Sequence, residues 1–123
     1  MKKIWLGLSV VVVAAVALSL IALPRGSEWT TDSPEALAEF TAAVDAQMKL
    51  YHNDVQAHLE NAVELDPDFV IAKLYLSEYY KMESDDRALQ LWNDVMAADR
   101  SKLTKREQVL IDRGRAIGEK RYE

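Results

Sequence analysis

Residues 61–80 read NAVELDPDFVIAKLYLSEYY. An apolar, helix-favouring run stops at Leu65, and a second such run begins three residues later. Proline disfavours the helical conformation at the residue before it, so the first helix must end by Asp66. The fixed φ angle of Pro67 suits the start of the next helix, and Asp68 supplies negative charge for its positive end. A link this short makes the two helices lie antiparallel against each other.

The rest of the chain after Pro34 repeats this pattern of a helix and a short break. Only Pro67, Gly114 and Gly118 follow residue 34 as helix breakers. Apolar residues recur at steps of three and four, which is the spacing of one helix face. We expect an all-α domain with helices over residues 34–51, 54–65, 68–81, 85–98 and 104–118.

Residues that cap helix N-termini precede several of these segments. The candidates for single caps are Asp32 or Ser33, Asn53 and Ser84. Thr104 and Glu107 have the spacing of a capping box, in which each side chain accepts a hydrogen bond from the other residue's backbone amide.

The units of helix, short loop and helix resemble the tetratricopeptide repeat family. The segment AHLENAVELDPDFVIAKLYLSEYY carries the closest match, with an A-x-x-L-D-P pattern that joins one repeat to the next. The matching positions are Ala43, Leu59, Ala62 and Pro67 in the first unit, and Tyr80, Ala88 and Trp92 in the second. The resemblance implies about two and a half repeats, which are residues 34–67, residues 68–100, and residues 101–123 as a partial third repeat or a capping helix.

The second unit departs from the family pattern. Arg100 stands where a proline is usual, the loop between its helices is one residue short, and SKLTK is inserted before the last helix. The segment LTKREQVLIDRGRA is similar to segments inside longer repeat arrays of membrane-tethered bacterial regulators. The chain is therefore either a short stack closed by a cap or part of a longer array.

The resemblance also implies a groove, lined by the first helix of each repeat, that binds proteins or peptides. By position, the groove residues are Phe40, Val44, Gln47, Ile71, Tyr75 and Glu78. The family's clamp for a peptide carboxylate uses lysine and asparagine, whereas Phe40, Val44 and Leu74 stand at such places here. An apolar groove instead suits an amphipathic helix or an extended hydrophobic segment. The alternative is that these residues pack the core of the stack, above all Val44 and Leu74.

The N-terminus predicts a membrane anchor. Residues 4–23 carry no charge, and twenty helical residues span a bilayer core of roughly 30 Å. Lysines 2 and 3 precede the segment and favour a cytoplasmic N-terminus, so the repeat domain would lie in the periplasm of a bacterium, at the inner membrane. A cleaved signal is the alternative, although its apolar stretch is usually shorter. Residues 24–33 read as a linker, in which Trp29 is either an anchor at the membrane interface or a plain linker residue.

Charge and composition exclude several kinds of chemistry. The chain has no cysteine and a formal net charge of -5, and an acidic domain repels nucleic acid. His52, which we expect in a loop, and His58 are six residues apart and would point to different sides of one helix, so no metal site is predicted. No glycine-rich phosphate loop or nucleophile elbow occurs, and we expect neither catalytic residues nor a cofactor.

These observations lead to one expected function and two alternatives. The first is a membrane-anchored adaptor that binds other proteins or peptides through its repeat groove. The second is the sensor or regulatory region of a larger membrane-tethered signalling or transcriptional regulator. The third is a secreted periplasmic repeat protein whose leader is cleaved. The sequence leaves the identity of the partner and the oligomeric state open.

Overall fold

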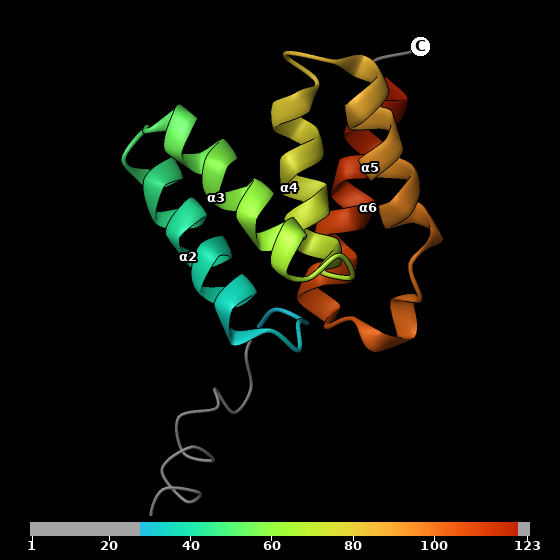
Figure 1. Ribbon diagram of the computed structural model, residues 1–123. Helices are drawn as coiled ribbons and strands as arrows, with labels where there is room; N and C mark the ends of the chain where they lie inside the picture. The colour runs from blue at the N-terminus through green and yellow to red at the C-terminus, as the bar shows by residue number, and fades with distance from the viewer. Residues whose placement is uncertain (1–27, 121–123) are drawn as a thin grey trace, which may run out of the picture.

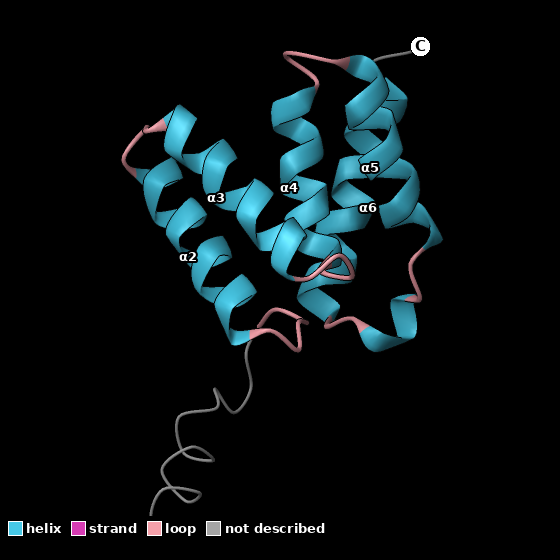
Figure 2. Ribbon diagram, viewed as in Figure 1, coloured by secondary structure: helices cyan, strands magenta, loops and turns pink. Residues whose placement is uncertain are grey.

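The computed structural model describes residues 28–120, which form five α-helices and one short 3₁₀ helix and contain no strand (Figures 1 and 2). The all-α prediction is confirmed for this part of the chain. The bounds are α2 Pro34–Met48, α3 His52–Leu65, α4 Val70–Tyr80, α5 Asp85–Ala97, the 3₁₀ helix η1 Arg100–Lys102, and α6 Lys105–Lys120.

Consecutive α-helices run in opposite directions, so that α2 pairs with α3 and α4 pairs with α5 (Figure 1). Helix α3 also packs on α4 and joins the two pairs, while α6 packs on α4. At this contact Gly114 lies against Leu74 and Trp92, and a Cβ at residue 114 would be 3.4 Å from the Trp92 ring. The order of the helices is consistent with a stack of helical repeats.

The turn around Pro67 is longer than the sequence predicts. The Asp66 backbone is extended, with φ -140° and ψ 94°, which ends α3 at Leu65 as expected. The Oδ1 atom of Asp66 then accepts a hydrogen bond from the Asp68 amide at 3.0 Å, and its carbonyl accepts one from Phe69 at 3.1 Å. Because these bonds fold residues 66–69 into a turn of their own, α4 begins at Val70 and not at Asp68.

The predicted helix starts have mixed outcomes. Ser33 is confirmed as a cap, since its Oγ accepts a hydrogen bond from the Ala36 amide at 3.1 Å. Asn53 is wrong as a cap, because α3 begins at His52, two residues earlier than predicted, and Tyr51 takes the cap position. Ser84 occupies the position before α5, but its hydroxyl makes no capping hydrogen bond.

The first helix ends three residues earlier than predicted, at Met48 instead of Tyr51. Leu50 adopts a positive φ of 63°, which breaks the helix without a glycine. Positive φ crowds the Cβ of any residue other than glycine, and Leu50 is also 72% exposed. The tip between α2 and α3 is therefore strained and apolar.

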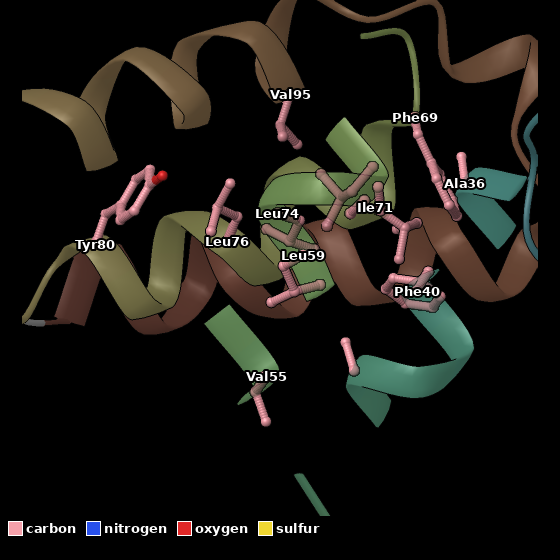
Figure 3. Close-up of a cluster of buried hydrophobic side chains, with 14 of the residues drawn as sticks. Ala36, Phe40, Val55, Leu59, Phe69, Ile71, Leu74, Leu76, Tyr80 and Val95 are labelled. Atoms are coloured by element: carbon pink, nitrogen blue, oxygen red, sulfur yellow. The ribbon is translucent and has the colours of Figure 1, made fainter. Parts of the chain in front are cut away.

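The hydrophobic core runs through all five helices (Figure 3). Large side chains without exposed surface are Phe40 from α2, Leu59 and Val55 from α3, Phe69 and Ile71 at the start of α4, Val95 from α5 and Ile111 from α6. The small buried residues of α2 and α3 include Ala36, Ala43 and Ala62. Burial of this kind is the main source of stability for short helices, which are marginal alone.

Within residues 28–120 no helix has both the length and the apolarity to cross a bilayer. Three predicted features lie outside the described residues: the anchor at residues 4–23, the alternative cleavage site, and residues 24–27 of the linker.

Candidate protein-binding surface

The structure places the six predicted groove residues at very different depths. Phe40 and Ile71 have no exposed surface and belong to the core. Val44 and Tyr75 are half-buried and pack against that core, whereas the remaining two residues, Gln47 and Glu78, are exposed. A partner could therefore touch only the last four residues, and the prediction of Phe40 and Ile71 as groove surface is corrected by their burial.

Phe40 is buried because it is the centre of an aromatic cluster. Its ring centroid lies 5.2 Å from Trp29, 5.2 Å from Phe69 and 5.4 Å from Tyr75. The Trp29 and Tyr75 rings meet Phe40 edge to face, an arrangement that is favourable beyond simple burial. The contact between Phe40 and Tyr75 thus joins α2 to α4 within this cluster.

The segment Glu28–Thr31, here called the N-terminal strap, is the feature that the sequence did not predict. The Thr30 amide donates to Oε1 of Glu107 at 2.5 Å, and the Thr30 hydroxyl donates to Oε2 at 2.7 Å. Glu107 has no exposed surface. Its Oε2 also accepts from the Thr104 amide at 2.8 Å, while its own amide donates to the Thr104 hydroxyl at 3.2 Å. The capping box is thus confirmed, and the same carboxylate holds the strap.

Further contacts fix both ends of the strap. Glu28 forms an ion pair with Arg106, whose guanidinium lies 4.8 Å from the centre of the Trp29 ring. The Thr104 hydroxyl donates to the Glu28 carbonyl at 3.1 Å, and the Thr31 hydroxyl donates to Asp66 at 2.5 Å. Residues 28–31 are therefore part of the folded domain and not a free linker. In the domain, Trp29 packs against Phe40 instead of acting as a plain linker residue.

One cavity, of about 570 Å³, lies where the strap, the Pro67 turn and η1 meet. Its charged lining includes Asp66, Asp94 and Asp99 together with Lys73. These carboxylates bind partners within the fold: Asp66 binds Thr31 and Asp68, Asp99 accepts from Ser101, and Asp94 lies 3.2 Å from Lys73. The hydrogen bonds from Ser101 hold the pKa of Asp99 below its usual value.

The second cavity, of about 310 Å³, lies between α3 and α5 and contains a polar network. The Tyr80 hydroxyl donates to Glu60 at 2.8 Å and accepts from Arg87 at 2.6 Å. The Arg87 guanidinium also lies 4.0 Å from the centre of the Tyr80 ring. Burial, helped by the hydrogen bond to Glu60, raises the pKa of Tyr80 to about 12. The phenol stays neutral at physiological pH and links the two helix pairs.

The two histidines do not form a metal site in the described part of the chain. His52 is the first residue of α3 and not a loop residue, and His58 lies two turns farther along. His58 Nδ1 lies 2.6 Å from Glu39 Oε2, and this hydrogen bond lowers the pKa of Glu39. Across residues 28–120 no three histidine, aspartate or glutamate residues converge as metal ligands.

Sequence reasoning missed Trp29, Thr30 and Glu107 as a connected group. The only signal was the capping-box spacing of Thr104 and Glu107. It predicts that the Glu107 carboxylate caps α6, but not that the same carboxylate binds Thr30. Comparison of the chain with protein-family models, with curated proteins and with solved structures found no match.

Proposed function

We propose that this protein is a membrane-anchored adaptor, similar to tetratricopeptide repeat proteins, that binds another protein or a peptide along α2 and α4. The observation that carries the proposal is the edge-to-face contact between Phe40 and Tyr75, which joins α2 to α4. Val44 follows Phe40 by one helical turn, and Glu78 follows Tyr75 by nearly one turn, so the accessible residues share one side. The binding surface is thus Val44, Gln47, Tyr75 and Glu78.

The chemistry of this surface favours a partner with both apolar and polar contacts. Val44 and Tyr75 offer half-exposed apolar area, and Tyr is a frequent anchor at interfaces because it combines a large ring with a hydroxyl. Gln47 and Glu78 border this area with polar groups. An amphipathic helix or an extended apolar segment fits such a surface.

The strap supports the membrane tether as part of the proposal. Glu28 is held against α6, and four residues lie between it and Leu23, the end of the apolar segment, so that five Cα–Cα steps join the two. An extended chain spans at most about 3.6 Å per residue, so the domain would lie within roughly 18 Å of the anchor. The adaptor would therefore present its partner close to the membrane surface.

Site-specific photo-crosslinking in membranes tests the binding surface. A photoreactive residue at Gln47 should capture a partner, and the same residue at the exposed Gln90 on α5 should capture none. Glu78→Lys should abolish the product formed at residue 47, whereas Glu64→Lys, an exposed charge reversal on α3, should leave it unchanged. Equal products at residues 47 and 90, or no effect of Glu78→Lys, would show that the surface is wrongly assigned.

The tether is tested by mass spectrometry of the N-terminus and by extraction of membranes with carbonate. A chain that retains Lys2 and stays in the membrane fraction supports the anchor. A mature N-terminus near residue 17 or beyond, in the soluble fraction, would instead make this a secreted protein.

A further inference from the structure

We propose that copies of this protein associate head to tail, with the outer face of α6 on one copy bound to the outer face of α2 and α3 on the next. This inference goes beyond the adaptor function and uses other residues. The basic face comprises Lys105, Val109 and Arg113 on α6, and the acidic face comprises Glu35, Ala38, Glu39 and Asp45 on α2 with Asp54 and Ala57 on α3.

Charge is distributed unevenly along the stack. Residues 34–65, which form α2 and α3, contain six acidic residues and a single lysine. Residues 100–120, which form η1 and α6, contain seven basic and three acidic residues, and one of these acids, Glu107, is buried. The first and last parts of the stack therefore carry opposite charge, which favours contact between unlike ends and disfavours contact between like ends.

The basic face is a helix side that no other described element covers. Helix α6 packs on α4, where Gly114 lies against Leu74, and its Ile111 is fully buried, whereas 64% of the surface of Val109 is exposed. Lys105 and Arg113 are exposed around Val109 and form no ion pair within residues 28–120. An exposed valine between two basic side chains suits burial against an acidic surface with a flat, apolar centre.

The acidic face has the complementary composition. Ala38 and Ala57 are exposed, and their small side chains leave room for a larger residue such as Val109. Glu39 and His58 join α2 to α3 at the middle of this face through their 2.6 Å contact. Glu35, Asp45 and Asp54 surround it with exposed carboxylates, of which only Asp45 has a basic partner, Lys49, in the described chain.

The position of the strap allows such a row of copies in one membrane. Helix α4 contacts α2 through Tyr75 and Phe40, and it contacts α6 through Leu74 and Gly114, so it lies between the two. The strap lies at one end of the helices, next to the Pro67 turn and η1 (Figure 1). Copies displaced across the helices would keep every strap on the same side. A heterologous contact of this kind continues as an open chain or closes into a ring. Only the alignment of the straps on one side of a membrane depends on the proposed anchor, and the contact between the basic and acidic faces does not.

Disulfide trapping tests the contact in the full-length protein, because the natural chain has no cysteine. Differently tagged Ala57→Cys and Val109→Cys variants are co-expressed in one cell and oxidised. We expect a heterodimer that joins the two tags, at a yield at least about tenfold above that of Leu89→Cys with either variant. Leu89 is a matched control because it is 57% exposed on α5.

Charge reversal then tests the physical cause. Lys105→Glu with Arg113→Glu should reduce the trapped heterodimer at least about tenfold, and Glu35→Lys with Asp54→Lys on the partner should restore it. Circular dichroism of each variant confirms that it is folded. Three outcomes would each overturn the proposal. The heterodimer yield could equal that of the Leu89→Cys control, Val109→Cys homodimers could predominate, or charge reversal could leave the yield unchanged. Glu78→Lys leaves the trapping unchanged, so failure of the adaptor surface and failure of this contact are distinguishable.

Discussion

Replacement of Glu107 by glutamine is the sharpest test of the N-terminal strap. The carboxylate of Glu107 accepts three hydrogen bonds, one at Oε1 from the Thr30 amide and two at Oε2 from the Thr30 hydroxyl and the Thr104 amide. Glutamine has nearly the same shape but only one acceptor oxygen. In the best orientation the glutamine oxygen takes the Oε2 position and still accepts from the Thr30 hydroxyl and the Thr104 amide. The glutamine NH₂ group then faces the Thr30 amide, so two donors oppose each other and this amide loses its acceptor.

The cost follows from these contacts. A buried donor left without an acceptor costs about 1–3 kcal/mol, and hydrogen bonds to a charged acceptor are stronger than those to a neutral one. One lost bond and two weakened bonds give an expected loss of about 3 kcal/mol for Glu107→Gln. The matched control is Glu35→Gln on the exposed part of α2, which should change the free energy of unfolding by less than about 0.5 kcal/mol.

Two measurements separate a local effect from a general one. Urea denaturation followed by circular dichroism gives the loss in the free energy of unfolding. Hydrogen exchange of the Thr30 amide should accelerate in Glu107→Gln well beyond that of amides inside α3, because this amide donates directly to the replaced carboxylate. If Glu107→Gln is as stable as Glu35→Gln and the Thr30 amide keeps its protection, the strap is not held by this carboxylate.

Three further predictions concern the core, a turn and a titrating group. Phe40→Ala should lower the free energy of unfolding in urea by about 3–5 kcal/mol, because the ring is fully buried, and Tyr75→Phe should cost under about 1 kcal/mol. Leu50→Gly should increase the free energy of unfolding by about 0.5–1 kcal/mol and so raise the midpoint of thermal unfolding, because glycine adopts the positive φ without strain. A lower midpoint would show that Leu50 is not strained. The folded-state pKa of Tyr80 lies near 12, above the unfolded value of about 10, so its contribution to stability is complete below pH 10 and is lost as the pH rises from 10 to 12. Tyr80→Phe should lose less stability than the natural protein between these two pH values in urea titrations.

The helices were predictable because their signals are local. Pro67 ends α3 where proline geometry requires, and the spacing of Thr104 and Glu107 gives the capping box with its hydrogen bonds. The start of α4 was misplaced because the Asp66 side chain competes for the Asp68 amide, which residue type alone does not reveal. Asn53 was a plausible cap that the early start of α3 bypasses.

The candidate binding surface was only partly predictable. Helical spacing gives the side of α2 on which Phe40 and Val44 lie, but it does not tell how much of each residue its neighbours cover. Part of the cover over Phe40 comes from Trp29, in a segment whose proline, glycine and hydroxyl residues are typical of a linker. The contact between Thr30 and Glu107 spans 77 residues of sequence, and no periodic pattern announces it.

The strap has a consequence for the order of events during translation. Thr30, which leaves the ribosome early, docks on a helix that is made late, because Glu107 follows Thr30 by 77 residues. At about 5–20 residues per second, Thr30 waits roughly 4–15 s before its partner is synthesised. Throughout that interval the Thr30 amide and hydroxyl lack the carboxylate that accepts their hydrogen bonds, and a chain that stops before residue 107 never acquires it. Proteases should cut such truncated products in the strap sooner than they cut the complete chain.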